Sequence, residues 1–283
     1  MKDNGKLIAP QHEAKRMCRQ SAYVNAKGEP SLLDSLCVFA DILGFRERVR
    51  GAALCGRSNE AFEDFRSTWE CAQKELEPTE GFDPRKLNWS TKSFSDCVVV
   101  ALPLCPGVEV IDFEKLLHSL GRFQLALASR GYFLRGGLTR AELYAHGDVL
   151  YGEALLDAWD IEREVAVYPR IILAQEVIQL SEECAKDDYA KGAQATRYKS
   201  LQRRDPCDQQ TYLDYLGCTL GPSGHVEWEI LQRHREHIAR GIAENKDSRK
   251  VAAKYQWLAR YHNSFCDELR KYPDFAEFLL VTT

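Results

Sequence analysis

The chain has 283 residues, a net charge of −4 and a hydrophobic fraction of 45%. This composition is typical of a globular protein and excludes a disordered chain, and the net acidity argues against broad nucleic-acid binding. No apolar run approaches the roughly 18 residues that a membrane helix needs, and the N-terminus leads into no signal-peptide core. We therefore expect a soluble, cytoplasmic protein without membrane insertion. Ten cysteines without a CxxC pair indicate reduced, packed thiols.

Strands and helices are predicted to alternate irregularly, with a hairpin between them. A polar arm covers residues 1–30, a first domain covers 31–183, and a charged loop with a helical C-terminal extension covers 184–283. This pattern predicts an α+β sandwich with a mainly antiparallel mixed sheet, for which a ferredoxin-like order is suitable. Hydrophobic periodicity and turn residues give the elements in chain order: strand 36–43, helix 59–77, hairpin 87–104, helix 113–129, strand 132–146, helix 153–164, strand 169–173, a helix through 183, a loop or lid at 185–210, and helices 226–244 and 248–270.

Two carboxylates stand at the ends of apolar strands. Asp41 lies inside the run Val38–Phe45, where an ionised group is costly unless a charged or hydrogen-bonding partner meets it. Asp96 lies at the start of the apolar run 97–102. A lone Asp at a strand end is commonly a turn residue or a helix N-cap. We interpret the pair instead as meeting in space to hold metal ions, because Mg²⁺ takes oxygen ligands and usually one or two protein carboxylates.

Four segments in order resemble the class III nucleotidyl cyclases. Phe39–Phe45 looks like the first metal motif of that family, and Lys92–Asp96 looks like the second, with a lysine four residues before the aspartate. Arg135–Thr139 resembles the following strand, and Gly152–Glu162 the helix after it. The resemblance covers roughly residues 34–180. The strings DILGF, RGGLT and YPRII, with the helical C-terminal extension, are most similar to the bacterial pyrimidine cyclases of Pycsar antiphage defence.

The resemblance implies a fold, an activity and partners. It implies a class III cyclase sandwich over residues 31–183 that works as a homodimer with sites at the interface. The implied reaction is cyclisation of UTP, or less often CTP, to the 3′,5′-cyclic monophosphate and pyrophosphate, with two Mg²⁺ or Mn²⁺ ions per site. In such systems the product acts on a separate effector, commonly a membrane or TIR-domain protein.

The resemblance also assigns roles to individual residues. Its metal ligands are Asp41, Ile42 and Asp96, and Arg135 joins the two aspartates as a catalytic residue. Backbone amides in the turn after the first strand are suited to cradle phosphates, which gives Gly44, Phe45 and Arg46 as substrate-binding residues. Lys92 is placed to donate to a carbonyl on the base. As alternatives, Arg46 is a solvated surface arginine and Lys92 a hairpin-tip lysine in water.

The chain departs from the family pattern on the helix after residue 152. Purine cyclases carry an asparagine and an arginine there that steady the transition state, whereas this chain has Leu156 and Asp160. Neither side chain donates to phosphate, so Arg135, Arg170 or a residue of 185–210 is a candidate substitute. Three alternatives stay open: a cytidylate cyclase, a purine nucleotide cyclase, and a non-catalytic module that binds a nucleotide or protein and reports through the C-terminal helices.

Overall fold

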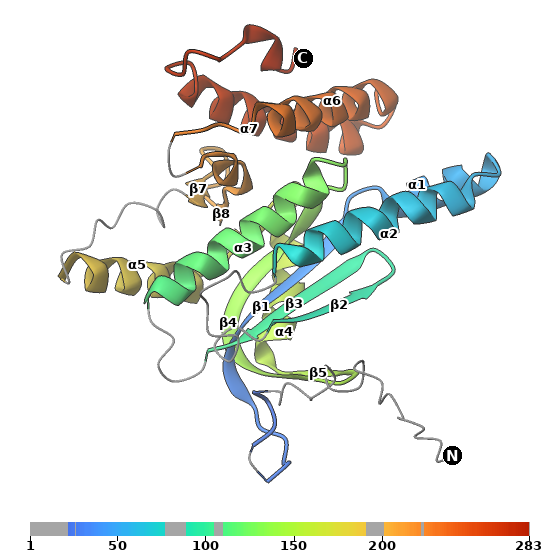
Figure 1. Ribbon diagram of the computed structural model, residues 1–283. Coiled ribbons are helices and arrows are strands. Elements are labelled where there is room, and N and C mark those ends of the chain that lie inside the picture. The colour runs from blue at the N-terminus through green and yellow to red at the C-terminus, as the bar shows by residue number, and fades with distance from the viewer. Residues whose placement is uncertain are drawn as a thin grey trace, which may run out of the picture.

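The computed structural model describes residues 22–25, 27–76, 89–104, 110–190, 201–221 and 224–282 (Figure 1). Most of the expected arm at 1–30 and part of the expected loop at 185–210 therefore lie outside the described residues. The elements run in this order: β1 (Leu33–Ile42), α1 (Phe45–Leu54), α2 (Ser58–Lys74), β2 (Ser90–Phe94), β3 (Cys97–Pro103), α3 (Val110–Ala128), β4 (Leu134–His146), β5 (Val149–Tyr151), α4 (Glu153–Asp160), β6 (Ile171–Leu173), α5 (Gln175–Ala190), β7 (Gln202–Arg204), β8 (Thr211–Leu213), α6 (Trp228–Glu244) and α7 (Arg249–Glu268).

The sheet has the order β2-β3-β1-β4-β6-β8-β7, with β5 paired to β4 alone. Its first four strands are antiparallel neighbours, and α1 and α2 lie between β1 and β2 in sequence while α3 lies between β3 and β4. This β-α-β-β-α-β connection is the ferredoxin-like arrangement. β6 then adds parallel to β4. The expected α+β fold, with a mixed and mainly antiparallel sheet, is confirmed.

Successive side chains of β1 point to opposite faces of the sheet, and each face packs against its own hydrophobic core. Leu36, Val38 and Ala40 face the larger core, which is closed by α3 residues such as Leu117 and Leu120. Cys37 and its neighbours on β3 and β4 face a smaller core that Ala154 of α4 covers. Figure 1 shows α2 and α3 on one side of the sheet and α4 on the other. The sheet therefore carries one residue face toward α4, and Asp41 belongs to that face.

The C-terminal helices share the larger core. α6 and α7 pack together, and Trp257, Tyr261 and Phe265 of α7 are buried in the same cluster as the sheet. Strands β7 and β8, which also follow residue 184, complete one edge of the sheet. The expected boundary between 183 and 184 stays a prediction. Among the described residues, no helix combines the length and hydropathy needed to cross a membrane.

Helix α1 is the main difference from the expected elements, because no helix was predicted between residues 45 and 54. Its ten residues include none that is buried, so it has no apolar stripe for a periodicity argument to detect. Gly44 precedes it in the left-handed region, with φ 70°. Three short strands, β5, β7 and β8, were not predicted either. The loop expected at 185–210 is wrong at both of its ends, because α5 continues to Ala190 and β7 begins at Gln202.

Candidate metal and phosphate site

Asp41 and Asp96 lie next to each other at one end of the sheet. Asp41 is the second-last residue of β1 and pairs with Cys97, the first residue of β3. The backbone N–H of Ile42 donates to the carbonyl of Asp96 over 2.9 Å, which locks the β1 end to the β2–β3 turn. Both aspartates are partly exposed. The fold therefore brings the two positions side by side through the Ile42 N–H, and that their carboxylates hold metal ions stays a prediction.

The turn that carries Asp96 is short because β2 and β3 form a two-residue hairpin. Phe94 and Cys97 are paired, so only Ser95 and Asp96 connect the strands. Ser95 has a φ of 57°, a left-handed conformation of the kind that two-residue hairpins require at a central position. The tight turn fixes the backbone of Asp96 beside the end of β1.

Arg135 and Glu162 complete a charged cluster around Asp41. Arg135 of β4 pairs with Asp41 in register, and its Nη2 donates to Asp41 Oδ2 over 2.8 Å. The same nitrogen donates to Glu162, and Nη1 donates to the carbonyl of Ala166 over 3.3 Å. Glu162 is buried within a π-helical turn, Ile161–Val165, that follows α4. Such turns often mark functional sites.

Burial and charge perturb several groups at this end of the sheet. The pKa of Glu162 is raised because burial disfavours its anion and the charge of Asp41 adds to this, although Arg135 and Lys254 oppose both effects. Burial also lowers the pKa of the Lys254 ammonium, and the Arg135 charge adds to the shift. Lys254 belongs to α7, so the C-terminal helices contribute a cation to the same electrostatic environment. Perturbed groups that cluster in this way are candidates for function.

The pKa of the Cys97 thiol gives a second indication that the three acids lie close together. Its pKa is raised first by burial and then by the charges of Asp96, Asp41 and Glu162. All three carboxylates therefore lie within electrostatic range of one point on β3. The cluster therefore contains three acids and two bases, Arg135 and Lys254, so its formal charge is negative by one.

The predicted phosphate-binding turn follows directly from β1. Gly44 leaves the strand with positive φ, and α1 begins at Phe45. The first amides of a helix have no carbonyl one turn earlier, and they point outward with the positive end of the helix dipole. Arg46 is exposed on this first turn. Its N–H and that of Phe45 are therefore donors without an acceptor inside the helix, at the end of α1 that follows β1.

Lys92 lies on the same face of the sheet as Asp41 but farther away. It pairs with Val99, which pairs with Phe39, so Lys92 is two strands and one side-chain row from Asp41. Its ammonium donates to the carbonyl of Gly147 over 2.5 Å. Lys92 is thus not a free hairpin-tip side chain, since the β4–β5 turn holds it.

Arg170 is not part of this cluster, although the sequence offered it as a transition-state cation. It is fully buried and ion-paired with Asp205 and Asp208, and its guanidinium lies 5.4 Å from the Trp257 ring centroid. This environment gives it a packing role. The 185–210 candidates lie partly outside the described residues.

Leu156 and Asp160, at the two positions where the family pattern departs, are both exposed on α4. Glu162, two residues beyond Asp160, is the side chain from this segment that turns inward and contacts Arg135.

The donor set of the two aspartates is compatible with a hard divalent cation. Carboxylate oxygens are what Mg²⁺ and Mn²⁺ prefer, and Mg²⁺ is commonly held by one or two carboxylates with substrate phosphates completing the shell. Within the described part of the chain, no group of three or more His, Cys, Asp or Glu side chains is arranged to hold a metal by itself. Asp41 and Asp96 therefore fit an ion that arrives with a triphosphate, and Arg135 competes for Asp41 Oδ2.

Sequence reasoning did not assign roles to Glu162 and Lys254. Glu162 falls near the end of an expected helix and Lys254 inside another, where charged residues normally face water. Neither position carries a local motif. The contacts that matter join residues 41, 135, 162 and 254, and those separations appear only in the folded chain.

Comparisons with known proteins found similar structures but no matching sequence. No family model matches the chain, and no curated protein matches it. The chain is similar to the guanylyl cyclase Cya2, with 11% identity and a TM-score of 0.40 over 53% of this chain and 78% of that one. It is also similar to a class III adenylyl cyclase-like ATP-binding protein from Pseudomonas aeruginosa, with 16% identity and a TM-score of 0.40 over 71% of this chain and 43% of that one. These values place the chain in no family, so its function is inferred from its own residues.

Proposed function

We propose that this protein is a metal-dependent nucleotidyl cyclase that converts UTP to 3′,5′-cyclic UMP and pyrophosphate, as a cytoplasmic second-messenger signal in antiphage defence. The observation that carries the proposal is the 2.9 Å hydrogen bond from Ile42 N–H to the Asp96 carbonyl, which sets Asp41 beside Asp96. The motif resemblance of Phe39–Phe45 and Lys92–Asp96 supports it independently of the geometry.

The reaction needs positioning and charge neutralisation. The ribose 3′-oxygen attacks the α-phosphorus in line, the bond from that phosphorus to the pyrophosphate oxygen breaks with its electron pair leaving on pyrophosphate, and the 3′-hydroxyl proton passes to water. Two Mg²⁺ or Mn²⁺ ions, held by Asp41, Asp96 and the Ile42 carbonyl, would supply charge neutralisation for the attacking and leaving oxygens. The residues of the chain then orient the triphosphate, and preorganised orientation of this kind contributes much of the rate enhancement.

The groups for the phosphates come from β4 and α1. Amides at Gly44, Phe45 and Arg46 supply donors at a helix N-terminus, which suits a negatively charged phosphate chain. Arg135 lies beside Asp41 with two donating nitrogens, and it can exchange Asp41 Oδ2 for a phosphate oxygen when an ion takes the carboxylate. Arg135 is therefore the proposed catalytic cation in place of the missing asparagine and arginine. Lys254 adds a second positive charge nearby.

The proposed base contact is Lys92. Uracil presents carbonyl acceptors, and an ammonium donates to acceptors only. In this structure the same ammonium donates to the Gly147 carbonyl over 2.5 Å, so a uracil carbonyl would replace one backbone acceptor with another. This exchange favours UTP over CTP, which offers an amino group at the corresponding edge.

The second copy of the chain is the proposed partner at this face. Phe94, Leu156 and Trp159 are 84%, 56% and 47% exposed, and they lie on the β2–β3 hairpin that carries Asp96 and on α4, which precedes Glu162. Exposed apolar side chains such as those of Phe94, Leu156 and Trp159 mark candidate interaction surfaces. We expect sedimentation equilibrium to give a dimer, and Trp159→Glu to give a monomer. A separate effector protein would read the product.

The test is a product assay with matched variants. Purified protein is incubated with each of the four nucleoside triphosphates and Mn²⁺, and the products are resolved by mass. Cyclic UMP from UTP is the expected result, and Asp41→Asn and Asp96→Asn should each lower the rate by at least about a hundredfold. Asp34→Asn on the same strand is the control, since Asp34 pairs with Arg140 away from the site. A folded dimer that yields no cyclic product from any triphosphate would refute the proposal, while a cytidylate or purine product would select that alternative.

A non-catalytic module is the second candidate, and one observation favours it. Arg135 bridges Asp41 and Glu162, which neutralises the first metal ligand with a residue of the same chain. A module of this kind would bind a nucleotide without turnover and signal through α6 and α7. It requires that Asp41→Ala and Asp96→Ala leave nucleotide binding unchanged. If the unmodified chain turns over nucleotide and the folded Asp41→Ala and Asp96→Ala variants both lose that turnover, the non-catalytic module is eliminated.

A further inference from the structure

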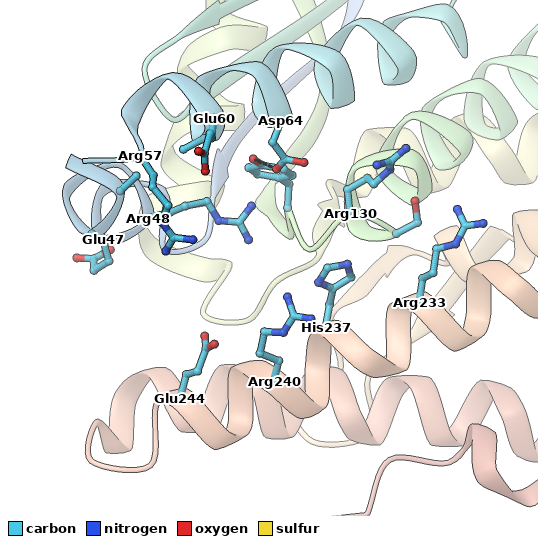
Figure 2. A pocket seen from close by; sticks show the side chains of 15 residues that line it. Glu47, Arg48, Arg57, Glu60, Asp64, Arg130, Arg233, His237, Arg240 and Glu244 are labelled. Carbon is cyan, nitrogen blue, oxygen red and sulfur yellow. Dashed lines mark hydrogen bonds between the residues drawn. The ribbon is translucent and has the colours of Figure 1, made fainter. Parts of the chain in front are cut away.

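A second charged groove lies away from the two aspartates. It is an open cavity of about 950 Å³ between α1 and the start of α2 on one side and α6 on the other, with the α3–β4 connection at its base (Figure 2). Its lining includes Arg48, Arg130 and Arg240 but none of Asp41, Asp96, Lys92 or Arg135. Its volume is within the range of sites for small organic ligands.

The arginines of the groove are largely without ion-pair partners. Five of them line it, from α1, the α1–α2 link, the α3–β4 connection and α6, and among described residues only Arg233 has an ion pair, to Glu229. Arg48 donates to the carbonyl of Gly131 over 3.2 Å, and its guanidinium lies 4.1 Å from the centroid of the Tyr132 ring. Both contacts orient the fork without neutralising it.

Carboxylates also line the groove, but they are not paired with these arginines in the described structure. Glu47, Glu60, Asp64 and Glu244 are the four acids. Asp64 accepts the hydroxyl hydrogen of Tyr132 over 2.8 Å, so one of its oxygens is already used. Figure 2 shows Arg48 reaching from α1 and Arg240 from α6 toward the His237 ring, while Glu47 and Glu244 lie toward one end of the groove.

His237 lies between the two walls of the groove, within electrostatic range of arginines on both. The ring is half-buried, and it packs on Gly131, where an added Cβ would come within 2.6 Å of Nδ1. Burial lowers the pKa of His237, and the charges of Arg240 and Arg48 lower it further and rank above the opposing charges of Glu236 and Asp64. Arg48 and Arg240 therefore act on one half-buried ring from the two walls of the groove.

We propose that this groove is a second binding site, for a phosphate-bearing small molecule of nucleotide size, with Arg48 and Arg240 contacting phosphate oxygens from opposite walls. Guanidinium groups match phosphate in geometry and bind it in a bidentate manner. The ligand would join α1 to α6, and so the first domain to the C-terminal helices. The site does not depend on the proposed cyclase activity, because the two sets of residues do not overlap.

The probe is inorganic tripolyphosphate, titrated calorimetrically into the full chain with EDTA present. EDTA removes the divalent ions that binding at Asp41 and Asp96 would need. We expect saturable binding that Arg240→Glu weakens at least about tenfold, equivalent to about 1.4 kcal/mol. Arg260→Glu is the matched control, since Arg260 is exposed on α7 outside the groove and makes the same charge change. A parallel titration with UTP identifies the class of ligand. Tighter binding of UTP than of tripolyphosphate indicates a nucleotide site, and equal binding of the two indicates a site for the phosphate chain alone.

Two outcomes overturn the proposal. One is equal weakening by Arg240→Glu and Arg260→Glu, which means diffuse charge attraction. The other is loss of binding in the Asp41→Ala/Asp96→Ala variant, which means that the probe occupies the first site. Hydrogen exchange on the unmodified chain provides a measurement without any variant: tripolyphosphate should protect amides of α1 and α6 together, and protection of neither contradicts the site.

Discussion

Arg135 Nη2 lies 2.8 Å from Asp41 Oδ2 and donates to Glu162 as well, so one guanidinium serves two acids. Pairing of β1 with β4 brings Asp41 and Arg135 together in register, and the π-helical turn after α4 brings Glu162 to them. The exposed fractions of the Arg135 and Asp41 side chains are 21% and 28%, so solvent and ions still reach the pair. A divalent cation that binds Asp41 through Oδ2 therefore competes with Arg135.

This competition predicts the effect of Arg135→Gln on metal binding. The variant removes one positive charge next to Asp41, so Mn²⁺ meets less repulsion and no rival donor at Oδ2. We expect the Mn²⁺ concentration that half-maximally raises the melting temperature to fall about tenfold. Thermal unfolding over a Mn²⁺ series measures it.

The control for this experiment is Arg140→Gln. Arg140 lies on the same strand and pairs with Asp34 of β1, also at 2.8 Å, but outside the charged cluster. Its Mn²⁺ response should match that of the unmodified chain. If Arg135→Gln instead requires more Mn²⁺, then Arg135 supports the ion site and does not compete for it.

Even the smallest substitution at Gly136, to alanine, should lower the stability of the fold strongly. A Cβ at Gly136 would come within 2.2 Å of the Phe39 carbonyl and 2.7 Å of Ala40 Cα, both on the adjacent strand β1, and backbone cannot give way cheaply. Gly136→Ala should lower the free energy of unfolding by about 3 kcal/mol, the upper part of the overpacking range. Urea unfolding measures the change. Gly51→Ala is the matched control, since nothing lies within 4 Å of that Cβ and the helix should gain about 0.5–1 kcal/mol. A loss at Gly51 would contradict the argument from space alone.

Substitution of Arg170 should lower the stability of the fold without affecting the metal site. It is fully buried, and Asp205 beside it also accepts from Trp257 Nε1 over 2.7 Å. Arg170→Gln leaves a buried carboxylate short of its counter-charge, which typically costs about 3–5 kcal/mol. Arg66→Gln should change stability far less, because Arg66 and its partners Glu63 and Glu70 are exposed. Chemical unfolding of both variants compares them, and equal losses would show that the buried pair has no special weight.

The strands and the meeting of Asp41 with Asp96 were predictable because they rest on local patterns. Apolar runs define β1 and β3, and a hairpin keeps β3 close to the turn that carries Asp96. Once β3 pairs with β1, the residue before Cys97 must lie beside the β1 end. Short-range rules thus gave the two strands, and the pairing of β3 with β1 sets two residues 55 positions apart side by side.

The rest depended on contacts with no local signal. Glu162 turns inward because a π-helical turn replaces the expected end of a regular helix. Lys254 reaches the cluster only because α7 packs back on the sheet. Helix α1 has no buried side chain, so its existence is set by Gly44 and its contact with α2 instead of by an apolar face. Patterns of residue type along the chain carry none of this information.

A buried hydrogen-bond chain joins α6 to α7 and defines the protonation of two histidines. His262 Nε2 lies 2.9 Å from the Leu279 carbonyl, so that nitrogen must carry hydrogen. In a neutral ring, His262 Nδ1 then accepts from His234 Nδ1–H over 2.9 Å. His234 Nε2 in turn accepts from the Tyr215 hydroxyl over 2.8 Å. Each position is satisfied when both rings are neutral, and an added proton would set two N–H groups against each other.

This network predicts acid sensitivity. Burial lowers the pKa of His262 to about 4 and that of His234 well below 6.5, the ordinary histidine value. The unfolded chain therefore binds more protons between about pH 4 and 6.5, and stability present above that window is lost as pH falls through it. The pKa of His262 alone corresponds to on the order of 3 kcal/mol. Urea unfolding across this range should show the loss, His262→Gln should flatten it, and His225→Gln, at an exposed position, should retain it. An unchanged acid limb in folded His262→Gln would assign the loss to other groups.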